Sequence, residues 1–132
     1  MKITADANVL LRAVVEDDPA QARLAQAELT GAEAVVLTVP ALCEFVWVMR
    51  QGYKCPRGEI AAAIRRLIEG DTALADRAAV EAGLAQLDAG GDFADGAIAY
   101  EGVWMGSDEF VSFDRRAVVR LQSQGIAARR LV

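Results

Sequence analysis

Five acidic residues stand at positions where an α/β protein can build a catalytic site. Asp6 and Asp114 each follow a short strand-like run, KITA and EFVSF. Glu44 is the only acid in the apolar stretch ALCEFVWVM, and Asp92 and Asp95 begin the helix-like segment DFADGAIAYEGVW. Side chains at the carboxyl ends of neighbouring parallel strands face one crevice. If the strands before Asp6 and Asp114 are neighbours, their two carboxylates therefore face the same crevice.

Carboxylates that converge in one crevice repel each other, and the repulsion raises their pKa values. A divalent cation removes this repulsion, and oxygen ligands without His or Cys favour Mg²⁺ or Mn²⁺. Such an ion activates a bound water and stabilises the charge that builds on a phosphate during in-line displacement. The chain has no histidine, so Ser-His-Asp and Cys-His sites are excluded. The pattern therefore indicates metal-dependent phosphodiester hydrolysis.

Each acid also has a purely structural interpretation when it is taken alone. Asp6 suits a turn, and Asp92 and Asp114 suit helix N-caps. Asp95 suits a capping box or the positive end of a helix dipole. Glu44 differs, because its helix is apolar nearly all round and should be largely buried. A lone buried carboxylate needs a partner, so we expect another group to meet Glu44.

The composition restricts the class of protein. A length of 132 residues suits one compact domain. The net charge of −5 argues against nucleic-acid binding by bulk charge, although a local basic face is still open, for example Arg115 and Arg116 with Arg120. No apolar run reaches the roughly 18 residues of a membrane span, and no signal peptide is apparent, so we expect a cytoplasmic protein. Cys43 and Cys55 fit no zinc motif and are expected to be free thiols.

Strand and helix patterns alternate along the whole chain. This alternation predicts one α/β domain over residues 1–132, with a parallel sheet and helices on both faces. Asn8 is the expected N-cap of the first helix, and Pro19 and Pro40 are expected to open the second and third. The expected strands are 2–5, 34–39, 72–75, 109–113 and 126–132, and the expected helices are 8–15, 17–29, 40–52, 56–70, 76–91, 92–106 and 115–125.

Four motifs in this order resemble the PIN-domain family, specifically the VapC-type toxins of toxin–antitoxin pairs. They are DANVLLRAVVEDDP, LCEFVWVM, GGDFADGAIA and FVSFDRRA, and the resemblance runs from residue 2 to about 120. The resemblance implies a single PIN domain with a five-stranded parallel sheet. It also implies Mg²⁺-dependent endoribonuclease activity, a homodimer, and inhibition by a small cognate antitoxin.

The resemblance assigns roles to individual residues. Asp6 and Asp95 become the main metal ligands, with Mg²⁺ or Mn²⁺ as the ion, and Glu44 and Asp114 complete the catalytic cluster. The supporting positions match Asn8, Asp92 and Ser112. Apart from the resemblance, we expect nearby arginines to hold the RNA backbone, with Arg12, Arg115 and Arg116 as the candidates.

Two other functions stay open from the sequence. A phosphoacceptor or phosphatase domain uses an Asp nucleophile and normally needs a lysine near a later strand end, but no lysine follows Lys54. An inert PIN-like binding module is the other alternative.

The apolar residues Trp47, Tyr53 and Trp104 exceed what a small core needs. An exposed apolar patch would suit a homodimer interface or the binding of an antitoxin that is disordered when free.

Overall fold

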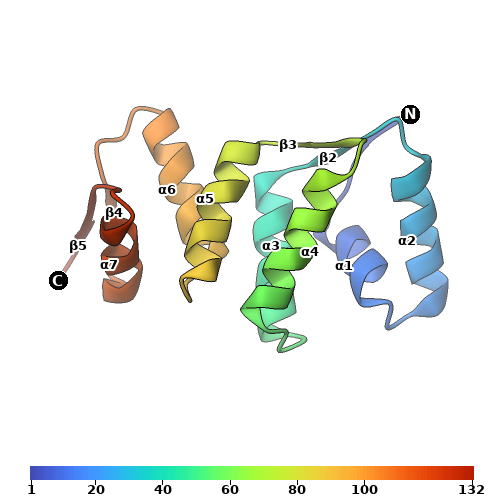
Figure 1. Cartoon of the computed structure of the whole chain (residues 1–132), viewed down its shortest axis with the longest axis horizontal. Helices are drawn as coiled ribbons and strands as arrows, with labels where there is room; N and C mark the ends of the chain where they lie inside the picture. Colours follow the sequence, from blue (N-terminus) through green and yellow to red (C-terminus); the bar gives the residue numbers. More distant parts are fainter. The chain divides into compact units, whose positions relative to one another are not determined.

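The computed structural model describes all 132 residues as seven helices and five short strands (Figure 1). The chain divides into two compact units, Met1–Asp76 and Arg77–Val132, and each is described by itself. All strand pairs within the units are parallel. No helix combines the length and the apolarity that crossing a bilayer requires.

The first unit contains a three-stranded parallel sheet in the order β1 (Lys2–Thr4), β2 (Ala34–Leu37) and β3 (Ala73–Ala75). Strand β1 is therefore an edge strand. Residues paired across parallel strands share a face, so Val35 and its partner Ala73 face one side while Val36 and Leu74 face the other. Val35 is 5% exposed and Leu74 is 53% exposed, so the first face is buried at this pair while the second is open to solvent at Leu74.

Four helices accompany this sheet: α1 (Ala7–Val15), α2 (Pro19–Gly31), α3 (Val39–Gln51) and α4 (Arg57–Glu69). Their apolar faces supply the core of the unit. The largest fully buried side chains in it are Leu10, Leu42, Phe45, Ile60 and Ile64. Burial of each such side chain stabilises the fold by roughly 1.5–3 kcal/mol relative to exposure.

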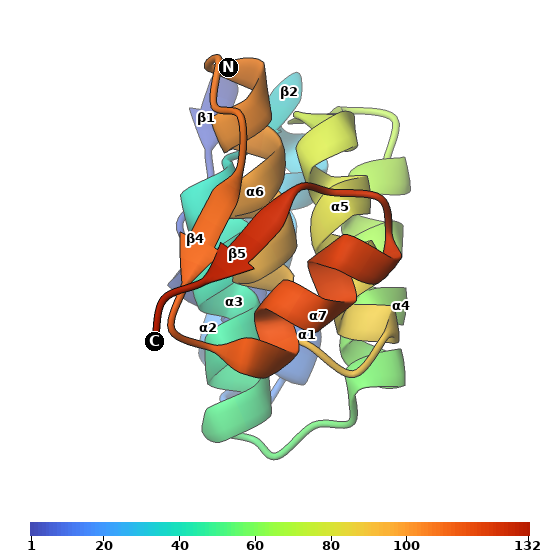
Figure 2. The same ribbon diagram turned by 90° about the vertical axis from the view of Figure 1, so that its left-hand side faces the viewer.

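The second unit consists of α5 (Arg77–Asp88), α6 (Phe93–Trp104), β4 (Phe110–Ser112), α7 (Arg115–Ser123) and β5 (Ala128–Arg130). Strands β4 and β5 form a two-stranded parallel sheet beside α7 (Figure 2). A short turn joins α5 to α6, and these helices pack very closely. A Cβ atom at Gly96 would lie 2.1 Å from the carbonyl oxygen of Ala82, so only glycine fits there.

The predicted order of helices and strands is correct, but the predicted single sheet of five strands is not what the structure contains. Each strand pairs only with strands of its own unit, giving sheets of three and two. Helix α1 begins at Ala7, because Asp6 rather than Asn8 is the N-cap. Helix α3 begins one residue before Pro40, with Thr38 as its N-cap.

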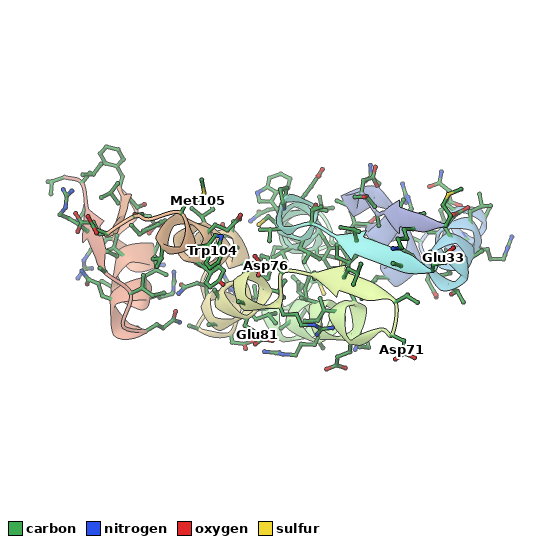
Figure 3. All side chains as sticks on the ribbon, turned by 90° about the horizontal axis from the view of Figure 1, so that it is seen from above. Glu33, Asp71, Asp76, Glu81, Trp104 and Met105 are labelled. Carbon is green, nitrogen blue, oxygen red and sulfur yellow. The ribbon has the colours of Figure 1, made fainter.

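Three aromatic residues that a core could have absorbed lie at the surface. Trp47, Tyr53 and Trp104 are 63%, 40% and 79% exposed. Trp104 projects from the end of α6 beside Met105, which is 84% exposed (Figure 3). Neither cysteine forms a disulfide, as expected.

Substitution of Gly96 by alanine is expected to lower the free energy of unfolding by roughly 1–3 kcal/mol, because the added methyl group would overlap the Ala82 carbonyl. Gly58→Ala is the matched control. It also lies within a helix but has no atom within 4 Å of its Cβ position, so it should stabilise the protein by roughly 0.5–1 kcal/mol. Urea unfolding of both variants measures the contrast, and equal effects would contradict the close helix contact.

Candidate active site

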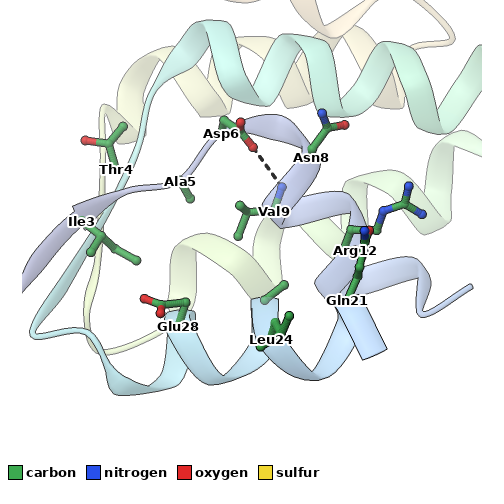
Figure 4. Close-up of a pocket in the computed structure, with 11 residues that line it drawn as sticks. Ile3, Thr4, Ala5, Asp6, Asn8, Val9, Arg12, Gln21, Leu24 and Glu28 are labelled. Atoms are coloured by element: carbon green, nitrogen blue, oxygen red, sulfur yellow. Dashed lines mark hydrogen bonds between the residues drawn. The ribbon is translucent and has the colours of Figure 1, made fainter. Parts of the chain in front are cut away.

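Asp6 lies at the carboxyl end of β1, where the chain turns into α1. Its backbone is extended (φ −81°, ψ 170°), and its Oδ1 accepts a hydrogen bond from the Val9 backbone N–H at 3.0 Å (Figure 4). The side chain is exposed and is therefore available to a ligand. Asn8 is also exposed, and no hydrogen bond joins it to Asp6.

A groove of about 760 Å³ runs along β1 and continues to Asp6. Its walls come from β1, α1 and α2 (Figure 4). Ile3, Val9, Leu24 and Ala25 give it an apolar floor, whereas Asp6 and other polar side chains lie around them. The groove therefore joins an apolar surface to a free carboxylate.

Arg12 also lines this groove, but its guanidinium group is engaged. It donates to Asp17 at 3.1 Å, and the Tyr53 hydroxyl donates to the other Asp17 oxygen at 3.0 Å. Both hydrogen bonds lower the pKa of Asp17, and the bond from Tyr53 has the largest effect. Arg12 thus connects α1 to the turn before α2 and is less free to hold RNA than the sequence suggested.

Glu44 does not need the buried partner that was expected for it. Helix α3 buries only one face, formed by Leu42, Phe45, Val46 and Met49, and Glu44 is exposed. The expectation was wrong because Trp47 was counted toward a fully apolar helix, yet Trp47 is 63% exposed. Water therefore solvates the Glu44 carboxylate, which is accessible to a ligand.

In the second unit, Asp92 and Asp114 cap two helices, as their structural interpretation predicted. Asp92 accepts from the Ala94 N–H at 3.2 Å, and Asp114 accepts from the Arg116 and Ala117 N–H groups at 3.0 and 3.2 Å. The Asp114 N–H in turn donates to the Ser112 hydroxyl at 3.0 Å. Ser112 therefore fixes the backbone that carries Asp114.

Asp95 is the one acid of this unit's candidate set without a structural role of this kind. It lies in the first turn of α6, it is half-buried, and its carboxylate accepts no hydrogen bond. Burial, then the negative charges of Asp92 and Asp114, raise its pKa, while the positive charge of Arg120 opposes them. The carboxylates of Asp92 and Asp114, at the N-termini of α6 and α7, thus act electrostatically on Asp95.

Arg120 is the member of this set that sequence reasoning did not connect to the acids. The sequence grouped it with Arg115 and Arg116 as a surface cluster. Its place on α7, the helix that Asp114 caps, was the sequence feature that could have indicated the connection. The Arg120 side chain extends toward Gly91, near the start of α6. The positive charge of Arg120 acts on Asp95 and opposes the rise of its pKa.

The donor chemistry of the candidate residues fits a hard divalent cation, because all the acids offer only oxygen. Asp6 and Glu44 belong to the first unit, and Asp92, Asp95 and Asp114 belong to the second. Within neither unit do three acidic side chains lie close enough to hold an ion together. The predicted metal ligands Asp6 and Asp95 thus belong to different units.

The comparisons with known proteins give no further guide to the site: no family model and no curated protein matches this chain.

Substitution of Asp95 by asparagine should stabilise the metal-free protein at neutral pH. A raised pKa in the folded state means that ionised Asp95 destabilises the fold, so the penalty is fully present above the raised pKa. The advantage of Asp95→Asn should shrink as the pH falls toward the ordinary value of 3.8.

Urea unfolding in EDTA across this pH range measures the difference. Glu101→Gln, an exposed acid on the same helix, is the control and should leave the pH dependence of stability as in the wild type. A destabilised Asp95→Asn protein at pH 7 would show that the carboxylate is held by favourable contacts instead.

Proposed function

We propose that the chain is a Mg²⁺-dependent endoribonuclease of the PIN-domain, VapC-type toxin class. The observation that carries the proposal is the half-buried Asp95 carboxylate, which has no hydrogen-bond donor and has two further carboxylates close by. Such an arrangement is unfavourable unless a cation joins it. The sequence has no histidine, so the proposed base is a carboxylate or a metal-bound hydroxide.

We further propose that β4 pairs with β1, so that the two small sheets become one sheet of five parallel strands. Both strands have the same layout: three residues, one connecting residue, then an aspartate that caps the next helix. In a parallel pair of matching register, equivalent residues lie about 5 Å apart. Asp6 and Asp114 would then stand side by side at one end of the sheet.

The apolar residues on the two strands support this pairing. Val111 and Phe113 are 46% and 73% exposed, and alternate residues of a strand share a face. In the matching register they lie on the face of Ile3, which lines the groove beside β1. Leu24, 70% exposed on α2, lines the same groove. Pairing would bury these side chains together and satisfy the open edge of β1.

In the joined sheet, Asp6 and Asp95 would hold Mg²⁺ or Mn²⁺, with Glu44 and Asp114 completing the acidic cluster directly or through water. A bound ion supplies a nucleophilic water and stabilises charge on the scissile phosphate. Asp92 and Ser112 keep the helix starts in place, through the bonds to Ala94 and to the Asp114 N–H. Without the ion, Asp95 holds a proton more readily than an exposed acid, because burial and then the charges of Asp92 and Asp114 raise its pKa. Binding of the ion requires that proton to leave.

Exposed apolar side chains support the proposed partners. Trp47, Trp104 and Met105 expose 63%, 79% and 84% of their surface, and aromatic residues and methionine are enriched where proteins associate. We propose a homodimer and a complex with a cognate antitoxin, both in the cytoplasm.

Asp6→Asn and Asp95→Asn should each lower RNA cleavage by at least about 100-fold, because each removes a metal ligand while keeping the side-chain shape. Asparagine also caps helices well, so Asp6→Asn should keep the start of α1. Cleavage of labelled RNA in Mg²⁺, with EDTA as a blank, measures the loss. Asp71→Asn, an exposed acid before β3, is the matched control and should retain wild-type activity.

Equal cleavage by the wild type and both site variants would identify a contaminating nuclease and refute the proposal. Incubation with acetyl phosphate tests the phosphoacceptor alternative. A phosphorylated Asp6 or Asp114 would favour that alternative over the nuclease.

Asp114→Ser separates the capping role of Asp114 from a role in catalysis. Serine caps helices about as well as aspartate, so the free energy of unfolding should change by less than about 0.5 kcal/mol. Cleavage should nevertheless fall by about tenfold or more, because the carboxylate is gone. Wild-type cleavage by this variant, at unchanged stability, would show that Asp114 is only a helix cap.

A further inference from the structure

One face of α7 carries a small basic hollow. Arg115, Arg116, Val119 and Arg120 line it, and it encloses about 220 Å³. These positions are neighbours on a helix surface, because residues four apart lie one above the other. The opposite face of α7 is buried, so it fixes the direction in which the hollow opens.

Two arginines of the hollow, Arg115 and Arg116, lack the ion pairs that Arg12 and Arg129 make. Arg12 pairs with Asp17 at 3.1 Å, and Arg129 pairs with Glu109 at 2.8 Å. Arg115 and Arg116 are exposed, and neither guanidinium group makes a hydrogen bond or an ion pair. The chain has 19 acids and 14 basic residues, so acidic partners are not scarce. An unpaired arginine pair in an acidic protein is suited to an external anion.

The hollow lies close to the acids Asp92, Asp95 and Asp114 of the same unit. The Arg120 side chain lies over Gly91, with Cδ 3.0 Å from where a Cβ of that residue would be. Its positive charge acts on Asp95. Arg115 directly follows Asp114, whose carboxylate caps α7. An anion held in the hollow therefore lies next to the acids proposed to bind the metal.

We propose that this hollow binds a backbone phosphate of single-stranded RNA that neighbours the phosphate to be cleaved, an assignment that rests on the proposed nuclease function. Arg115 and Arg116 supply planar donor groups that match phosphate oxygens. Val119, 51% exposed, offers an apolar contact beside them. Contacts of this kind position the chain without reading its sequence.

The test measures RNA binding separately from cleavage. Fluorescence anisotropy with a labelled single-stranded RNA in EDTA gives the dissociation constant without turnover. Arg115→Gln/Arg116→Gln should bind at least about tenfold more weakly at low salt. The slope of log affinity against log salt should become less steep by about 0.7, because one phosphate contact is lost.

Arg23→Gln/Lys54→Gln is the matched control, because it also removes two exposed basic residues but lies in the other unit. It should keep most of the affinity. An equal loss in both double variants would show that only net charge matters and would overturn the assignment, as would absence of RNA binding by the wild type.

The two proposals can fail independently. Arginine-dependent RNA binding without Mg²⁺-dependent cleavage would refute the nuclease and leave the phosphate site standing. Cleavage by the wild type, with unchanged RNA affinity in Arg115→Gln/Arg116→Gln, would refute the phosphate site and leave the nuclease standing.

Discussion

Repulsion between carboxylates at the starts of two helices is the constraint on which the candidate site depends. Asp92 and Asp114 are held by backbone N–H groups, which is a favourable position for a negative charge. Asp95 has no such bond and is partly withdrawn from water. The fold therefore places the Asp95 carboxylate where its ionised form is disfavoured. Acids with perturbed pKa values are frequent at functional sites.

The capping bonds of Asp6 and Asp114 are compatible with the catalytic role proposed for both residues. An N-cap uses one carboxylate oxygen, as Asp114 does with Oδ1 toward the Arg116 and Ala117 N–H groups. Asp6 uses Oδ1 toward Val9 in the same way. The other oxygen of each stays available for a metal ion or for water. Capping also fixes the side-chain direction, which a metal site requires of its ligands.

The local elements could be predicted from the sequence because their signals are local. Asp18 before Pro19 marks the start of α2, and Asp92 and Asp114 cap α6 and α7 as predicted. Asp6 was missed as the first N-cap because Asn8 is an equally good capping residue by type. Glu44 was misplaced because the exposure of Trp47 depends on packing that residue types alone do not give. The pairing of β1 with β4 would depend on contacts far apart in the sequence, which no local pattern encodes.

The close contact of α5 with α6 has a consequence for the order of folding. Gly96 lets α6 approach the Ala82 carbonyl, and the two helices are joined by a short turn, so their contacts are near neighbours along the chain. Hairpins of this kind close quickly, because little chain entropy is lost before contacts form. The acids at the start of α6 would thus be set in place early, before β4 and β5, which follow α6 along the chain, have paired.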